Sequence, residues 1–144
     1  MPLPAPRLGL VVHYGWGAGR RPPPDTGKDR PCLIVDLETV EEPDLVNRSV
    51  VRATYLPISH VPPRAPEQAI PIPPRVAAHL GLTSQQSFIY TTCAVEDDWP
   101  FDVARIPGSI DRFDYGFVPP RLFEAVASDF RAYLEAHPMF SHKR

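Results

Sequence analysis

The sequence has 144 residues with a net charge of −2, and 43% of the residues are hydrophobic. This length fits one domain, the composition excludes a disordered or fibrous chain, and the near-neutral charge excludes a protein that coats long duplex DNA. The chain has 20 prolines, against about 7 in an average composition. Because proline interrupts helix interiors and central strands, this content excludes a helical bundle.

Short apolar runs separated by proline- and glycine-rich stretches predict mostly strands. Residues 1–7 are expected to form an extended leader, and residues 15–29 a basic loop. In chain order we expect strands at residues 8–14, 31–37, 49–58 and 87–95, weaker strands at 103–106 and 113–117, and a short helical turn at 76–80. The strand at 31–37 is apolar on both faces, which is typical of a central strand.

One long helix is expected near the C-terminal end. It begins at Pro119-Pro120, ends at His137-Pro138 and has an apolar residue at every fourth position: Leu122, Val126, Phe130 and Leu134. About five or six short strands followed by one helix predict an α+β fold, mainly β, with a small antiparallel barrel-like sheet. We expect a single domain over residues 1–144, with a flexible tail at 138–144.

The two cysteines, Cys32 and Cys93, lie inside strand-like apolar runs. Such thiols are usually buried, and a disulfide between them is possible but not indicated. The longest apolar run near the N-terminus is too short for a signal sequence or a membrane span. These features predict a cytoplasmic protein with no membrane partner.

Motifs with a defined chemistry are few. The glycines at 15, 17 and 19 lack the spacing of a dinucleotide site, residues 26–29 lack the pattern of a P-loop, and no serine lies in a nucleophile elbow. His137 and His142 have no cysteine near them. Four carboxylates could hold a divalent cation, but a solvated loop is the preferred interpretation because neighbouring side chains alternate in direction: Glu96, Asp97, Asp98 and Asp102. We therefore expect no metal and no cofactor.

Cations and hydroxyl groups gather at two strand ends. Lys28, Asp29 and Arg30 precede the central strand, and Ser59 and His60 follow the strand at 49–58. These groups meet only if the two strands are antiparallel neighbours, which the sequence does not force. The alternative interpretation of residues 28–30 is a salt-bridged loop end.

Several segments, in order, resemble the PemK/MazF toxins of bacterial type II toxin-antitoxin systems. Lys28-Asp-Arg-Pro31 and the apolar strand after it are similar to the Lys-x-Arg-Pro motif of the family, and Leu56-Pro-Ile-Ser-His60 is similar to its Pro-Ile-Thr segment. The other landmarks are Gly9-Leu-Val-Val-His-Tyr14, Ile70-Pro-Ile-Pro73, Leu80-Gly-Leu82, Trp99-Pro100 and Tyr115-Gly-Phe-Val-Pro119. The resemblance covers about residues 9–134, nearly the whole chain.

The resemblance implies an SH3-like barrel with one C-terminal helix, usually a homodimer. It also implies a toxin that cleaves single-stranded RNA, including mRNA, at selected sequences without a metal and is held off by a cognate antitoxin protein. The catalytic arginine of the family corresponds to Arg30 and its catalytic threonine to Ser59, where serine keeps the hydroxyl. The chain departs from the pattern at Cys93, Val95 and Phe101, where similar sequences carry Glu, Asn and Gly, so RNA contacts by those groups are expected to be absent.

Metal-free cleavage of RNA uses the 2′-OH as an internal nucleophile and leaves a 2′,3′-cyclic phosphate and a 5′-OH. Arg30 would stabilise the charge of the phosphorane, and Ser59 would hydrogen-bond a non-bridging oxygen. His60, or else His13, is the candidate general base or acid. The alternative for His60 is a polar loop end, and His13 lies mid-strand, where a structural role is more typical.

Further RNA contacts are expected from aromatic rings that could stack on unpaired bases and from the basic loop: Tyr14, Trp16, Arg20, Arg21 and Lys28. For Trp99 we expect core or dimer packing instead. Two functions of other classes remain open. One is a toxin of the same fold that poisons DNA gyrase by protein binding alone, and the other is a non-catalytic SH3-like interaction module.

Overall fold

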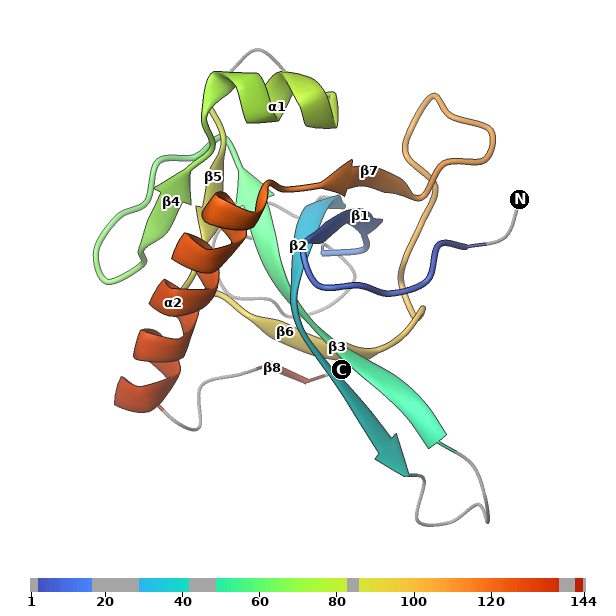
Figure 1. Ribbon diagram of the computed structural model, residues 1–144, viewed down its shortest axis with the longest axis horizontal. Coiled ribbons are helices and arrows are strands. Elements are labelled where there is room, and N and C mark those ends of the chain that lie inside the picture. Colours follow the sequence, from blue (N-terminus) through green and yellow to red (C-terminus); the bar gives the residue numbers. More distant parts are fainter. Residues whose placement is uncertain (1–2, 17–28, 42–48, 83–85, 138–141, 144) are drawn as a thin grey trace.

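A computed structural model describes residues 3–16, 29–41, 49–82, 86–137 and 142–143. The elements, in chain order, are β1 (Leu10–Tyr14), β2 (Arg30–Glu41), β3 (Ser49–Ser59), β4 (Ala69–Pro71), α1 (Pro74–Leu80), β5 (Phe88–Tyr90), β6 (Val95–Asp98), β7 (Asp114–Phe117), α2 (Pro120–Ala136) and β8 (His142–Lys143). The predicted α+β class, mainly β with an antiparallel sheet and a C-terminal helix, is confirmed (Figure 1).

β2 and β3 form the centre of the sheet. They run antiparallel, with Cys32 opposite Pro57 and Leu33 opposite Leu56, and their far ends extend beyond the rest of the molecule (Figure 1). The sheet order β4-β5-β3-β2-β1-β7 places β2 between β1 and β3. The prediction that this strand is central is therefore confirmed, because its apolar side chains face neighbours on both sides of the sheet.

The outer edge of β3 pairs with two different strands. Its middle pairs with β6, with Tyr55 opposite Val95, and its end pairs with β5, with Ser59 opposite Phe88. The prediction of one strand over residues 87–95 is wrong, because residues 91–94 leave the ladder. In this bend Thr91 donates its N–H to the Gln68 carbonyl and Thr92 Oγ1 accepts from the Gln68 N–H, which joins the bend to the loop before β4.

Three smaller differences between the predicted and the observed strands depend on which segments find a strand to pair with. Residues 103–106 form no strand, and the one ladder contact there is an isolated bridge between Tyr14 and Val103. Glu96–Asp98, expected in a loop, belongs to β6 because β3 supplies a partner for it. The short strand β4 was not predicted and pairs with β5.

Side chains from both faces of the sheet are buried. Along β1, Val11 belongs to one apolar cluster, whereas Leu10, Val12 and Tyr14 belong to another. This alternation is the period of a β-strand whose two faces are both covered. The free thiols Cys32 and Cys93 are buried in the second cluster, as expected.

Both helices adjoin the first cluster. α2 has Pro120 at its first turn, buries Val126, Ala127 and Phe130 and has His137 as its C-cap, so the predicted long helix is confirmed. The predicted short turn is the seven-residue helix α1, which ends at Gly81 in the left-handed conformation, with φ of 72°. Among the described residues, neither helix has the length and apolar composition to cross a membrane.

Leu33 is a sensitive test of this core. The side chain is fully buried between Val11 of β1 and Leu56 of β3. Leu33→Ala is expected to lower the free energy of unfolding by about 2–5 kcal/mol, because a cavity replaces the lost methyl groups. Urea unfolding measures the change, with Ile110→Ala as the control, since Ile110 is 87% exposed. Equal stability of the two variants would contradict this assignment of the core.

Candidate functional site

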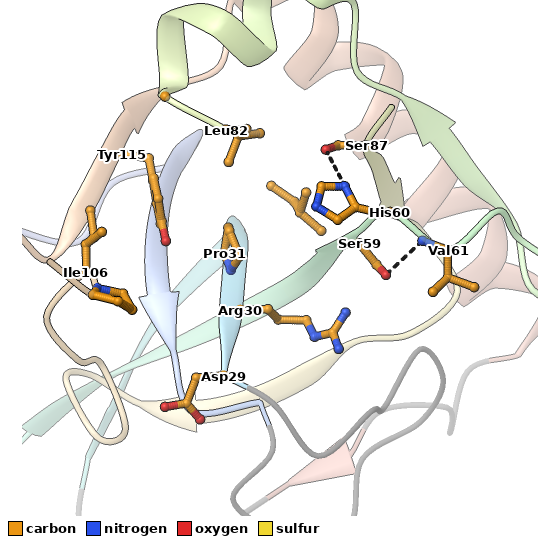
Figure 2. A pocket seen from close by; sticks show the side chains of 13 residues that line it. Asp29, Arg30, Pro31, Ser59, His60, Val61, Leu82, Ser87, Ile106 and Tyr115 are labelled. Carbon is orange, nitrogen blue, oxygen red and sulfur yellow. Dashed lines mark hydrogen bonds between the residues drawn. The ribbon is translucent and has the colours of Figure 1, made fainter. Parts of the chain in front are cut away.

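A pocket of about 500 Å³ lies where β2 begins and β3 ends (Figure 2). Cys32 of β2 lies opposite Pro57 of β3, and the two strands run antiparallel. Arg30, two residues before Cys32, and Ser59, two residues after Pro57, are therefore at the same end of the strand pair. Arg30, Ser59 and His60 all line the pocket. The antiparallel pairing that the sequence left open therefore exists, and it brings the three predicted catalytic residues together.

Arg30 provides a permanent positive charge at the floor of the pocket. Its side chain is buried, with 7% exposure, and its guanidinium extends towards Ser59 (Figure 2). Guanidinium cannot lose its proton in a protein and presents several N–H donors in a plane. Asp29 lines the same pocket, so the site combines a buried cation with one carboxylate near its edge.

The Ser59 hydroxyl can donate a hydrogen bond to a ligand in the pocket. The Val61 N–H donates to Ser59 Oγ at 3.1 Å, which uses one of the oxygen lone pairs and fixes the hydroxyl in the turn after β3. The hydroxyl proton has no acceptor among the described residues. A hydroxyl held in this way can donate to an anionic oxygen bound beside Arg30.

The ring of His60 is oriented by residues just before β5. His60 Nδ1 lies 3.3 Å from the Gln86 carbonyl oxygen and 3.4 Å from Ser87 Oγ (Figure 2). Because a carbonyl oxygen only accepts, Nδ1 carries the proton in the contact with Gln86. The neutral ring then has its lone pair on Nε2, which is the atom able to take up a proton.

Tyr115 of β7 lies across the pocket from His60 and Ser59 (Figure 2). Its hydroxyl is 3.0 Å from Nδ1 of His13. Burial raises the pKa of Tyr115 to about 12, so the phenol remains protonated at neutral pH. Burial lowers the pKa of His13 below its ordinary value, although the charge of Asp29 opposes this shift.

Tyr115 and Ser87 also line the pocket, but the sequence did not predict them as site residues. Tyr115 occurs in a segment that carries the family resemblance, and this was the one available signal for it. Ser87 has no comparable signal, because only the pairing of β5 with β3 brings it to the pocket. The remaining walls are mainly apolar, from Pro31, Ile58, Val61, Leu82, Ile106 and Pro107.

Tyr14 and Trp16 do not reach this surface. Both side chains have 0% exposure and belong to the second core cluster. The Tyr14 hydroxyl donates to Asp97, and its ring stacks on Tyr55 with centroids 4.2 Å apart. The expectation that Tyr14 and Trp16 stack on bases is therefore wrong for this structure, because both rings are buried in the second core cluster. Trp99 packs against the same cluster, which agrees with its expected core role.

The basic loop residues Arg20, Arg21 and Lys28 lie outside the described residues. The described chain resumes at Asp29 on the edge of the pocket. The expected contacts of the three basic residues with RNA stay predictions.

The carboxylate side chains of β6 do not point towards a common site. Asp97 points into the core and accepts a hydrogen bond from Tyr14, whereas Asp98 pairs with Arg52 at 3.2 Å. This divergence follows from the alternation of side chains along a strand. Within the part of the chain that the structure describes, no three His, Cys, Asp or Glu side chains are arranged to hold a metal ion.

Comparison of the chain with models of known protein families gives no match, and comparison with curated proteins also gives none. The pocket and the motifs that resemble the PemK/MazF family are therefore the two observations that bear on function.

The buried His13 predicts loss of stability in acid. In the unfolded chain this histidine titrates near its ordinary pKa of 6.5, whereas burial lowers the pKa in the folded state. Below about pH 6.5 the unfolded state binds more protons, so the free energy of unfolding should fall as the pH falls from about 7 to about 5.

His13→Asn removes this titrating group and should make the decline in stability shallower. Urea unfolding of both proteins at several pH values measures the two slopes. An identical decline in the variant would show that His13 does not contribute to the acid sensitivity.

Proposed function

We propose that this protein is a metal-independent endoribonuclease that cleaves single-stranded RNA through the 2′-OH, and that it is the toxin of a type II toxin-antitoxin pair of the PemK/MazF kind. The observation that supports this most strongly is that Arg30, Ser59 and His60 line one pocket. The family resemblance assigns the first two to catalysis, and they come from strands whose pairing is needed to join them.

The chemistry of the pocket fits in-line attack by the ribose. The 2′-oxygen forms a bond to phosphorus, the bond from phosphorus to the 5′-oxygen breaks, and the products are a 2′,3′-cyclic phosphate and a 5′-OH. Arg30 binds the non-bridging oxygens through its planar donors, and Ser59 donates its hydroxyl proton to one of them. His60 takes the proton of the 2′-OH at Nε2, and the departing 5′-oxygen takes a proton from water. The protonated His60 then returns its proton to the hydroxide, which restores the neutral ring.

The apolar walls favour an unpaired nucleotide as the ligand. Pockets of a few hundred cubic ångströms commonly bury small organic groups between apolar side chains, and this one has apolar side chains from several elements beside its buried cation. Bases are free to enter such a pocket only where the RNA is single-stranded. This is why we propose single-stranded RNA, including mRNA, as the substrate class.

The proposal extends to the partners of such toxins. We propose a homodimer, an inhibitory antitoxin protein and action in the cytoplasm, where mRNA is available. Leu8 and Phe117 are large apolar side chains exposed near the β1–β7 edge, and they offer part of the surface that a protein partner would cover.

Replacing Arg30 is the direct test. Arg30→Ala is expected to lower the rate of RNA cleavage by about 10²–10³-fold or more, because a preorganised charged donor to the reacting phosphate is lost. Arg30→Lys should stay well below wild type, since a point charge cannot make the bidentate contact. Gel-based cleavage of a long RNA measures the rate, and growth of cells that express each variant reports toxicity.

The matched control is Arg131→Ala, which removes an arginine from the exposed face of α2 outside the pocket. It should cleave RNA like wild type. Full cleavage by a folded Arg30→Ala variant would overturn the site, whereas toxicity that persists without any cleavage by wild type would favour the gyrase-binding class.

The ends of the products test the mechanism separately. We expect a 2′,3′-cyclic phosphate or its hydrolysed monoester upstream and a free 5′-OH downstream, with no effect of excess EDTA. A 2′-deoxy or 2′-O-methyl nucleotide at the cut position should block cleavage, because the nucleophile is missing. Mass spectrometry of the fragments identifies the ends. Fragments with 5′-phosphate ends that EDTA suppresses would point instead to a metal-activated water.

A further inference from the structure

The backbone of β7 turns Tyr115 towards the pocket. In the pairing of β1 with β7, Val11 lies opposite Gly116 and Val12 lies opposite Asp114, so Tyr115 is an extra residue in the ladder. Such a bulge redirects a side chain and is found frequently beside active sites. Gly116 has φ of 104°, which favours glycine, and its N–H donates to the Asp114 side chain at 3.1 Å. The bulge is thus stabilised locally.

The hydroxyl of Tyr115 contacts a buried histidine of β1. His13 has 7% exposure. Its backbone N–H donates to the Phe113 carbonyl, and its backbone carbonyl accepts from the Ala104 N–H. These bonds position the His13 backbone, and Nδ1 of its ring lies 3.0 Å from the Tyr115 oxygen. Burial is the largest cause of both pKa shifts: it lowers the pKa of His13 against the effect of Asp29. It raises the pKa of Tyr115, with Cys32 acting in the same direction and Arg112 opposing it.

A neutral imidazole can donate from Nδ1 to the phenol oxygen. When it does so, the phenol proton has no acceptor among the described residues and can be given to a ligand in the pocket. The pocket would then carry donors on two sides, with Arg30 and Ser59 on one and Tyr115 on the other (Figure 2).

We propose that Tyr115 is a further catalytic residue, whose hydroxyl hydrogen-bonds the reacting phosphate, and that His13 is the positioning residue that orients this hydroxyl. The inference depends on the proposed endoribonuclease function. Tyr115 keeps its proton throughout, so its contribution is a hydrogen bond to an oxygen whose negative charge grows in the transition state. Donors that are already oriented before reaction stabilise such charge most effectively.

Tyr115→Phe removes the hydroxyl and keeps the ring. We expect kcat to fall by about 10²-fold, as for other preorganised donors, with little change in KM. The melting temperature should fall by a few degrees, because the buried Nδ1 of His13 loses its partner. Tyr133→Phe is the control, because this tyrosine lies on α2 outside the pocket. Single-turnover and steady-state cleavage of an RNA with one cut site separate kcat from KM.

Two variants of His13 test the positioning role. His13→Leu removes the donor and should lower kcat as much as Tyr115→Phe does, whereas His13→Asn keeps an N–H donor near the position of Nδ1 and should restore much of the rate. In the double variant Tyr115→Phe/His13→Leu, kcat should be no lower than in Tyr115→Phe alone, because His13 acts through the hydroxyl.

The outcomes distinguish the two proposals. If wild type cuts RNA, Arg30→Ala does not, and Tyr115→Phe keeps the wild-type kcat, the inference is wrong and the proposed function stands. If His13→Leu lowers kcat further in the double variant, His13 is not a positioning residue for Tyr115. A wild-type protein that cuts no RNA overturns both proposals.

Discussion

The antiparallel register of β2 against β3 is the constraint on which the pocket depends. With Cys32 opposite Pro57, the first residue of β2 and the last residue of β3 share one end of the ladder, so the Arg30 cation and the Ser59 hydroxyl face a common space. Side chains alternate between the faces of a strand, and a slip of one residue would turn Arg30 to the opposite face. Apolar residues on both faces of β2 oppose such a slip, because each would leave its own cluster.

Coverage of both sheet faces explains why the site lies at strand ends. Two core clusters occupy the faces of β1, β2 and β3, and α2 covers one of them. Polar groups on those faces would be buried at a cost unless they were hydrogen-bonded, as Tyr14 and Asp97 are to each other. The ends of the strands are where a cation, hydroxyls and an imidazole can meet a ligand. Ser87, just before β5, and Tyr115 of β7 complete the polar lining of the pocket.

The chemistry of the pocket is divided between its sides. Arg30 and Ser59 offer donors for an anion, the contact of His60 with the Gln86 carbonyl leaves the lone pair of the neutral ring on Nε2, and Tyr115 with His13 forms a separate hydrogen-bonded pair. Donors held by buried partners need little reorganisation when charge develops on a bound phosphate. The proposed ribonuclease function uses each of these groups in a role that its protonation state permits.

Local pattern in the sequence determined α2, the central strand β2 and the burial of Cys32 and Cys93, because periodicity, proline positions and apolar runs act over a few residues. It also indicated Arg30, Ser59 and His60 as candidate catalytic residues, but it placed them only at separate strand ends. Tertiary structure decided what depends on distant partners. Pairing with β3 divides residues 87–95 into two strands, and packing in the second core cluster buries Tyr14 and Trp16. The bulge against β1 turns Tyr115 into the pocket. In each case the deciding contact joins residues far apart in the chain, and no window of neighbouring residues contains it.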